Sequence, residues 1–106
     1  MTQRKRHIER LFRLHYRAMY RLASILLHDD DESKDIVHDV FARLLVEPVE
    51  LHEDTAQSYL LSSVRNRCLN VIRNRKIHEQ VHRYLLLSED LEQTSPLEFE
   101  HELEVL

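Results

Sequence analysis

The sequence of 106 residues has no glycine and no tryptophan, and it has only two prolines and one cysteine. Tight hairpins and phosphate-binding loops need glycine where the backbone turns sharply or approaches a ligand closely. The absence of glycine therefore argues against a β-rich fold and against dinucleotide and Walker-type nucleotide sites. Because Cys68 has no second cysteine for an internal disulfide, we expect it to be a core thiol in a reducing compartment.

Long apolar segments are also missing, although 42% of the residues are hydrophobic. No apolar run approaches the length that spans a membrane, and the basic N-terminus is not followed by the apolar stretch of a secretory signal. We therefore expect a cytoplasmic protein without a membrane partner. The length corresponds to one domain, or to one domain with a tail.

Charge alternates in blocks along the chain, whose net charge is −4. Residues 1–28 hold seven cations against one acid, and residues 29–55 hold ten acids against two cations. Residues 56–78 hold five cations and no acid, and residues 79–106 hold eight acids against one cation. This alternation indicates two contact surfaces, one for a polyanion and one for a basic partner.

Apolar spacing predicts an all-α bundle of three to four helices. The first two helices are expected at about Gln3–His28 and Glu32–Val46, and the third follows Asp54. Their inward stripes are Ile8, Leu11, Phe12, His15, Met19, Leu22, Ile25 and Leu26 in the first, Ile36, Val37, Val40, Phe41 and Leu44 in the second, and Leu60, Leu61, Val64, Cys68, Val71 and Ile72 in the third.

The ends of the helices are predicted from polar residues that can cap them. One of the aspartates at 29–31 is expected to cap the second helix, and Asp54 with Gln57 matches a capping box for the third. Beyond residue 77 the helical pattern either continues or restarts through Val81, Tyr84 and Leu85.

The segment Tyr59–Lys76 combines its apolar stripe with a polar face that suits nucleic acid. Cationic side chains neutralise phosphates, and aromatic and amide side chains stack on bases or hydrogen-bond to them. The DNA-binding candidates are the aromatic and amide residues Tyr59, Asn66 and Asn70 and the cations Arg65, Arg67, Arg73, Arg75 and Lys76.

The order of these features resembles conserved region 2 of bacterial sigma factors, in particular the extracytoplasmic-function group of the sigma-70 family. The matching residues, over roughly Leu11 to Lys76, are Asp35-Ile36-Val37-His38-Asp39-Val40-Phe41, Tyr59-Leu60 and Arg65-Asn66-Arg67-Cys68-Leu69-Asn70 with Arg73. The resemblance implies a transcription initiation domain that binds RNA polymerase core and recognises or helps melt the promoter −10 element. We expect no enzymatic activity, no catalytic residue, no metal and no cofactor.

The resemblance also implies a division of labour. The outward face of the second helix would dock on the clamp helices of the largest RNA polymerase subunit, and the last helix with the loop before it would read the unpaired non-template strand. The polymerase-binding candidates are Asp35, His38, Asp39, Phe41, Ala42 and Leu45. An anti-sigma factor is a further candidate partner.

The sequence departs from the family in two places. The loop Glu47–Asp54 is acidic and has no aromatic residue, whereas the family's loop helps form a base pocket. We expect residues 1–87 to form the region 2 domain and residues 88–106 to form an acidic linker toward a second, region 4 domain that this chain lacks. A chain cut at that boundary is the favoured explanation over a protein with one domain.

Two other functions compete with this interpretation. A small helical interaction module would use the acidic second helix without binding DNA. A zinc peptidase would use His78-Glu79-Gln80-Val81-His82, which matches the H-E-x-x-H motif of two ligands and a base. The extended form of that motif is absent, because Ser88 stands where its third histidine would be.

Overall fold

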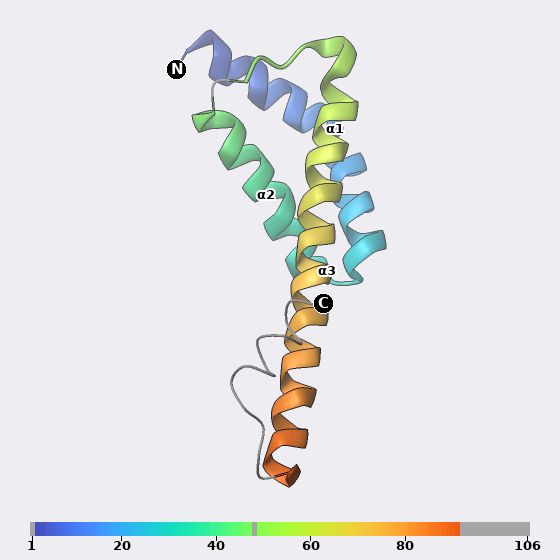
Figure 1. The fold of residues 1–106 in the computed structure, drawn as a ribbon. Coiled ribbons are helices and arrows are strands. Elements are labelled where there is room, and N and C mark those ends of the chain that lie inside the picture. Colours follow the sequence, from blue (N-terminus) through green and yellow to red (C-terminus); the bar gives the residue numbers. More distant parts are fainter. Residues whose placement is uncertain (1, 48, 92–106) are drawn as a thin grey trace. The chain divides into compact units, whose positions relative to one another are not determined.

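The computed structural model describes residues 2–47 and 49–91. Within these residues the chain forms three α-helices and no strand, which confirms the expected all-α fold (Figure 1). The helices are α1 (Gln3–Leu27), α2 (Asp30–Val46) and α3 (Glu53–Leu91). None of the described helices is long and apolar enough to cross a membrane.

The turn between α1 and α2 is sharp although the sequence has no glycine. His28 takes a left-handed conformation, with φ of 54°, and its N–H donates to the Ser24 carbonyl at 2.9 Å. Asp29 then caps α2, because its side chain accepts from the Glu32 N–H at 2.9 Å. The expected aspartate cap is therefore Asp29, and α2 begins two residues earlier than the apolar pattern indicates.

Side chains from all three helices form the core of a compact unit that contains residues 1–70. The deeply buried side chains include Ile8, Leu11, Met19 and Ala23 of α1, Val37, Val40 and Leu44 of α2, and Ala56, Leu60, Val64 and Cys68 of α3. Each fully buried aliphatic side chain contributes about 1.5–3 kcal/mol relative to exposure. Ile25, which the pattern assigns to the inward stripe, is 58% exposed, and its neighbours Ala23 and Leu27 are buried instead.

Helix α3 begins one residue before the predicted cap. Asp54 lies within the first turn together with Glu53, and the Thr55 N–H donates to the backbone carbonyl of His52. The predicted capping box at Asp54 is therefore wrong, although both carboxylates still complement the positive end of the helix dipole.

The helical pattern beyond residue 77 is a continuation of α3, which ends at Leu91. Residues 71–106 form a second compact unit, of which the structure describes the helical part up to Leu91. The predicted linker therefore starts within α3, and residues 92–106 of it lie outside the described residues.

Candidate nucleic-acid interface

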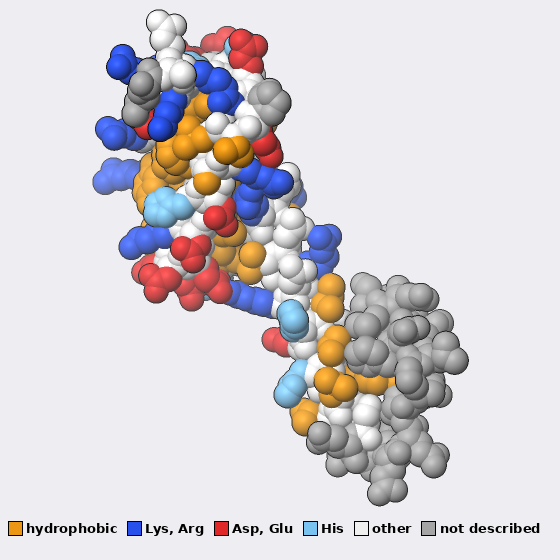
Figure 2. All heavy atoms as spheres, turned by 90° about the vertical axis from the view of Figure 1, so that its left-hand side faces the viewer, with side chains coloured by type: hydrophobic (Ala, Val, Ile, Leu, Met, Phe, Trp, Pro, Cys, Tyr) orange, Lys and Arg blue, Asp and Glu red, His pale blue; other side chains and the backbone are white. Residues whose placement is uncertain are grey.

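The outward face of α2 is exposed, as its periodicity predicts. Asp35, His38, Asp39 and Ala42 are exposed, whereas the intervening Ile36, Val37 and Val40 are buried. In the view of Figure 2, acidic side chains form one larger group and lie singly or in smaller groups elsewhere, and Lys and Arg side chains lie around them. This face presents carboxylates on a rigid helix, which suits a basic partner.

Phe41, a predicted polymerase contact, is only partly available at the surface. Its ring packs against Phe12 of α1 with centroids 4.5 Å apart, and Phe12 in turn contacts the edge of the Tyr16 ring at 5.5 Å. Tyr16 lies 6.5 Å from the ring of His38. An aromatic cluster from α1 thus supports the α2 face.

The contribution of α1 to this face was missed in the sequence. Phe12, Tyr16 and Tyr20 recur every four residues, which would have indicated one aromatic stripe along α1. The Tyr20 hydroxyl donates to Asp30 at 2.9 Å and so ties α1 to the first turn of α2.

A pocket of about 260 Å³ lies between α2 and the first part of α3. It is lined by Val40, Arg43 and Leu44 of α2, by Glu47, which caps the end of α2, and by Tyr59, Ser63, Asn66, Arg67 and Asn70 of α3. Four of the predicted DNA-binding residues, Tyr59, Asn66, Arg67 and Asn70, therefore surround one hollow. Arg43 and Glu47 complete it, and neither was predicted, because no local pattern places α2 opposite α3.

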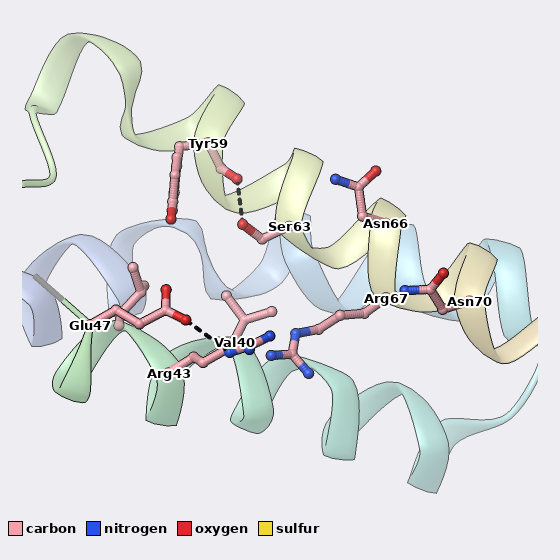
Figure 3. Close-up of a pocket in the computed structure, with 9 residues that line it drawn as sticks. Val40, Arg43, Glu47, Tyr59, Ser63, Asn66, Arg67 and Asn70 are labelled. Carbon is pink, nitrogen blue, oxygen red and sulfur yellow. Dashed lines mark hydrogen bonds and ion pairs between the residues drawn. The ribbon is translucent and has the colours of Figure 1, made fainter. Parts of the chain in front are cut away.

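Figure 3 shows how these side chains are arranged. The Tyr59 ring points from α3 toward α2, while Asn66 and Asn70 lie along the α3 side. The Arg43 and Arg67 side chains point toward one another from the two helices. The Ser63 hydroxyl donates to the backbone carbonyl of Tyr59 at 2.9 Å, and the Tyr59 ring is the one aromatic side chain that lines the pocket.

Both guanidinium groups of the pocket have a carboxylate partner. Arg43 pairs with Glu47 at 2.9 Å, one turn along α2. Arg67 reaches across to Asp39 of α2, with 3.9 Å between Nη1 and Oδ2. A predicted DNA contact and a predicted polymerase contact are thus paired with each other, and a phosphate that binds Arg67 must compete with Asp39.

The other predicted DNA-binding cations lie outside this pocket. Arg65 is exposed on α3 within the first unit, and Arg73, Arg75 and Lys76 are exposed on the part of α3 that belongs to the second. Tyr59 is 37% exposed, which leaves its ring accessible to a base.

The other motif residues to consider are the histidines of the H-E-x-x-H motif and Cys68. His78 and His82 are exposed one turn apart on α3, and no group of three or more metal-binding side chains occurs among the residues that the structure describes. Cys68 is fully buried, and burial raises the pKa of its thiol. Desolvation of the thiolate is the cause, and it disfavours reactivity.

Comparison with known proteins gives one match. The family model described as sigma-70 region 2 matches residues 11–77, which include the α2 face, the pocket and the whole segment Tyr59–Lys76. No significant match was found among curated proteins or solved structures.

Proposed function

The chain belongs to the sigma-70 region 2 family, and from this membership we propose that α2 docks on RNA polymerase core while the pocket between α2 and α3 receives the −10 non-template strand. The membership itself identifies a transcription initiation domain that interacts with RNA polymerase core and promoter DNA. The sharper proposal assigns these two interactions to residues, and it places the chain in the extracytoplasmic-function group.

The exposed carboxylates of α2 support the polymerase contact. Asp35 and Asp39 are one turn apart and face solvent, as does His38 between them. Complementary charge steers association with a basic helix and fixes its register. We assign this face, together with Ala42, Leu45 and the accessible edge of Phe41, to the clamp helices of the largest subunit.

The pocket supports contact with an extruded base. Its volume of about 260 Å³ lies just below the roughly 300–1,000 Å³ of sites for drug-sized molecules, which suits a single base. Tyr59 would stack on that base, and the amides of Asn66 and Asn70 would hydrogen-bond to its edges. Arg43 and Arg67 would hold the flanking phosphates.

The cations beyond the pocket would extend the phosphate contacts along the strand. Arg65, Arg73, Arg75 and Lys76 are assigned to that role, which is independent of sequence. Strand opening would then draw on the binding energy of extruded bases. We also propose that an anti-sigma factor binds the exposed α2 face.

The pocket that joins an accessible aromatic ring, two amides and two guanidinium groups is the observation that carries this proposal. Its test is the affinity of the chain, bound to bacterial core polymerase, for single-stranded DNA selected from a randomised library. Tyr59→Ala is expected to weaken binding roughly 5- to 150-fold, because base stacking on an aromatic ring contributes about 1–3 kcal/mol.

Tyr59→Phe is the matched control, since it keeps the ring and removes only the hydroxyl. It is expected to bind within about twofold of the unsubstituted chain, as a ring without the hydroxyl still stacks. Equal binding by the alanine and phenylalanine variants in fluorescence anisotropy would show that the ring does not read a base.

A further inference from the structure

The connection between α2 and α3 joins the two helices that form the walls of the pocket. Glu47 stands at its start, and α3, which begins at Glu53, presents Tyr59 less than two turns later. Among the described residues of this connection, the backbone hydrogen bonds are local: the Val49 N–H donates to the Glu47 carbonyl at 2.8 Å, and the Thr55 N–H donates to the His52 carbonyl at 3.2 Å. Side chains from elsewhere must therefore hold it in place.

Arg4 of α1 supplies most of that support. Its guanidinium donates to the carbonyls of Leu44 at 3.0 Å, Leu45 at 3.4 Å and Val49 at 3.3 Å, and also to that of Glu47. The last carbonyls of a helix have no partner within the helix, so a cation there satisfies them and opposes the negative end of the dipole. The planar fork of arginine can serve several acceptors at once, which a lysine ammonium cannot match.

Two further α1 side chains hold the far end of the connection. His7 Nε2 donates to the carbonyl of the buried Leu51 at 2.6 Å, and Arg10 donates to His7 Nδ1 at 3.4 Å. Arg10 also pairs with Glu53, the first residue of α3. Arg4, His7 and Arg10 recur every three residues, so they form one stripe on α1, named here the α1 brace.

We propose that the α1 brace is a positioning element for promoter recognition: it fixes residues 47 and 49–53 and thereby the spacing of Glu47 and Tyr59 across the pocket. This rests on the proposed role of the pocket. The brace precedes the family-matched residues 11–77, and its guanidinium groups are engaged with the protein itself. The brace is thus assigned to act through the pocket, and a phosphate contact by Arg4 would show itself in the salt dependence of binding.

Arg4→Ala tests the brace, with Arg6→Ala as the matched control. Arg6 is an exposed cation on the same helix that makes none of the contacts to the connection. For the chain bound to core polymerase, one measures two quantities with single-stranded DNA: the affinity ratio between the selected sequence and single-base variants, and the slope of log affinity against log salt concentration. Amide hydrogen exchange at residues 49–55 is measured without DNA.

Arg4→Ala is expected to speed exchange at residues 49–55 and to lower the affinity ratio at one or more bases by roughly fivefold or more, the usual discrimination at a contacted position. The salt slope is expected to stay within about 0.3 of that of the unsubstituted chain, since a lost phosphate contact would reduce it by about 0.7. Arg6→Ala should leave the exchange rates and the affinity ratio unchanged. Arg4→Lys keeps the charge without the fork and should resemble Arg4→Ala.

Three results would overturn the brace. The first is a uniform loss of affinity with a reduced slope, which would make Arg4 a phosphate contact. The second is full discrimination by Arg4→Ala, and the third is restoration of that discrimination by lysine. If Arg4→Ala does not fold, the lysine variant and the exchange data decide. If the unsubstituted chain itself shows no base preference, the role of the pocket fails, and the exchange data then test the brace alone.

Discussion

Because Arg67 is paired with Asp39, we expect the substitution Asp39→Asn to raise the affinity for DNA and to lower the affinity for core polymerase. Asp39→Asn keeps the shape of the side chain and removes its charge. DNA that binds Arg67 must first separate it from Asp39, so loss of the pair favours DNA. Core polymerase would lose an acidic contact on α2, so the same change should weaken that complex.

The size of the effect follows from the geometry. Two unit charges 3.9 Å apart attract by about 1 kcal/mol at the dielectric constant of water. The Asp39 side chain is 63% exposed and that of Arg67 is 26% exposed, and measured pairs of this kind contribute about 0.2–1 kcal/mol. Affinity of the chain for single-stranded DNA is therefore expected to rise by a factor of about 1.4 to 5.

The assay is fluorescence anisotropy with a labelled oligonucleotide at about 0.1 M salt, beside a titration of the chain with core polymerase. Asp35→Asn is the matched control, because Asp35 is exposed on the same face and is not the partner of Arg67. It should weaken polymerase binding while DNA affinity gains less than with Asp39→Asn. A DNA affinity for Asp39→Asn that equals or falls below that of Asp35→Asn would refute the competition.

Two further predictions concern the core. Leu60→Ala should lower the free energy of unfolding by about 2–5 kcal/mol in urea denaturation, because Leu60 is fully buried. Leu69→Ala, at a position 40% exposed on the same helix, should lower it by less than about 1 kcal/mol. Similar losses for the two variants would contradict the assigned packing of α3. Because burial raises the pKa of the Cys68 thiol, the unfolded chain loses this proton first, so stability is expected to fall as pH rises from the ordinary thiol pKa toward the raised one. The difference in unfolding free energy between the unsubstituted chain and Cys68→Ala, followed across that range, isolates this effect, and a difference independent of pH would contradict it.

The helices and the α2 face could be predicted because both depend on short-range periodicity. Each turn of a helix brings residues three and four positions apart to one side. The acidic face of α2 and its buried stripe therefore both follow from the spacing of residues that are close in sequence. The cap of α3 could not be placed this way, because several acidic residues near Glu53 offer equivalent starts and the choice depends on the connection before it.

Only the α3 side of the pocket could be predicted from the sequence. Tyr59, Asn66 and Asn70 share the polar face of α3, which the sequence reveals by itself. Arg43 and Glu47 face them across the gap between two helices, and no sequence period relates the two. The site residues proposed for polymerase and DNA therefore gain their mutual geometry from packing.

Composition and short-range helical spacing are enough to predict the all-helical fold, the acidic face of α2 and the cationic character of α3. The pairing of charges, in contrast, depends on how the helices pack. Arg67 pairs with Asp39, 28 positions away, and Arg4 donates to carbonyls 40 to 45 positions away, at the end of α2 and just after it. The packing of the buried stripes determines these partners. It sets the distance and the rotation between the helices, and so it determines which surface charges lie close enough to pair.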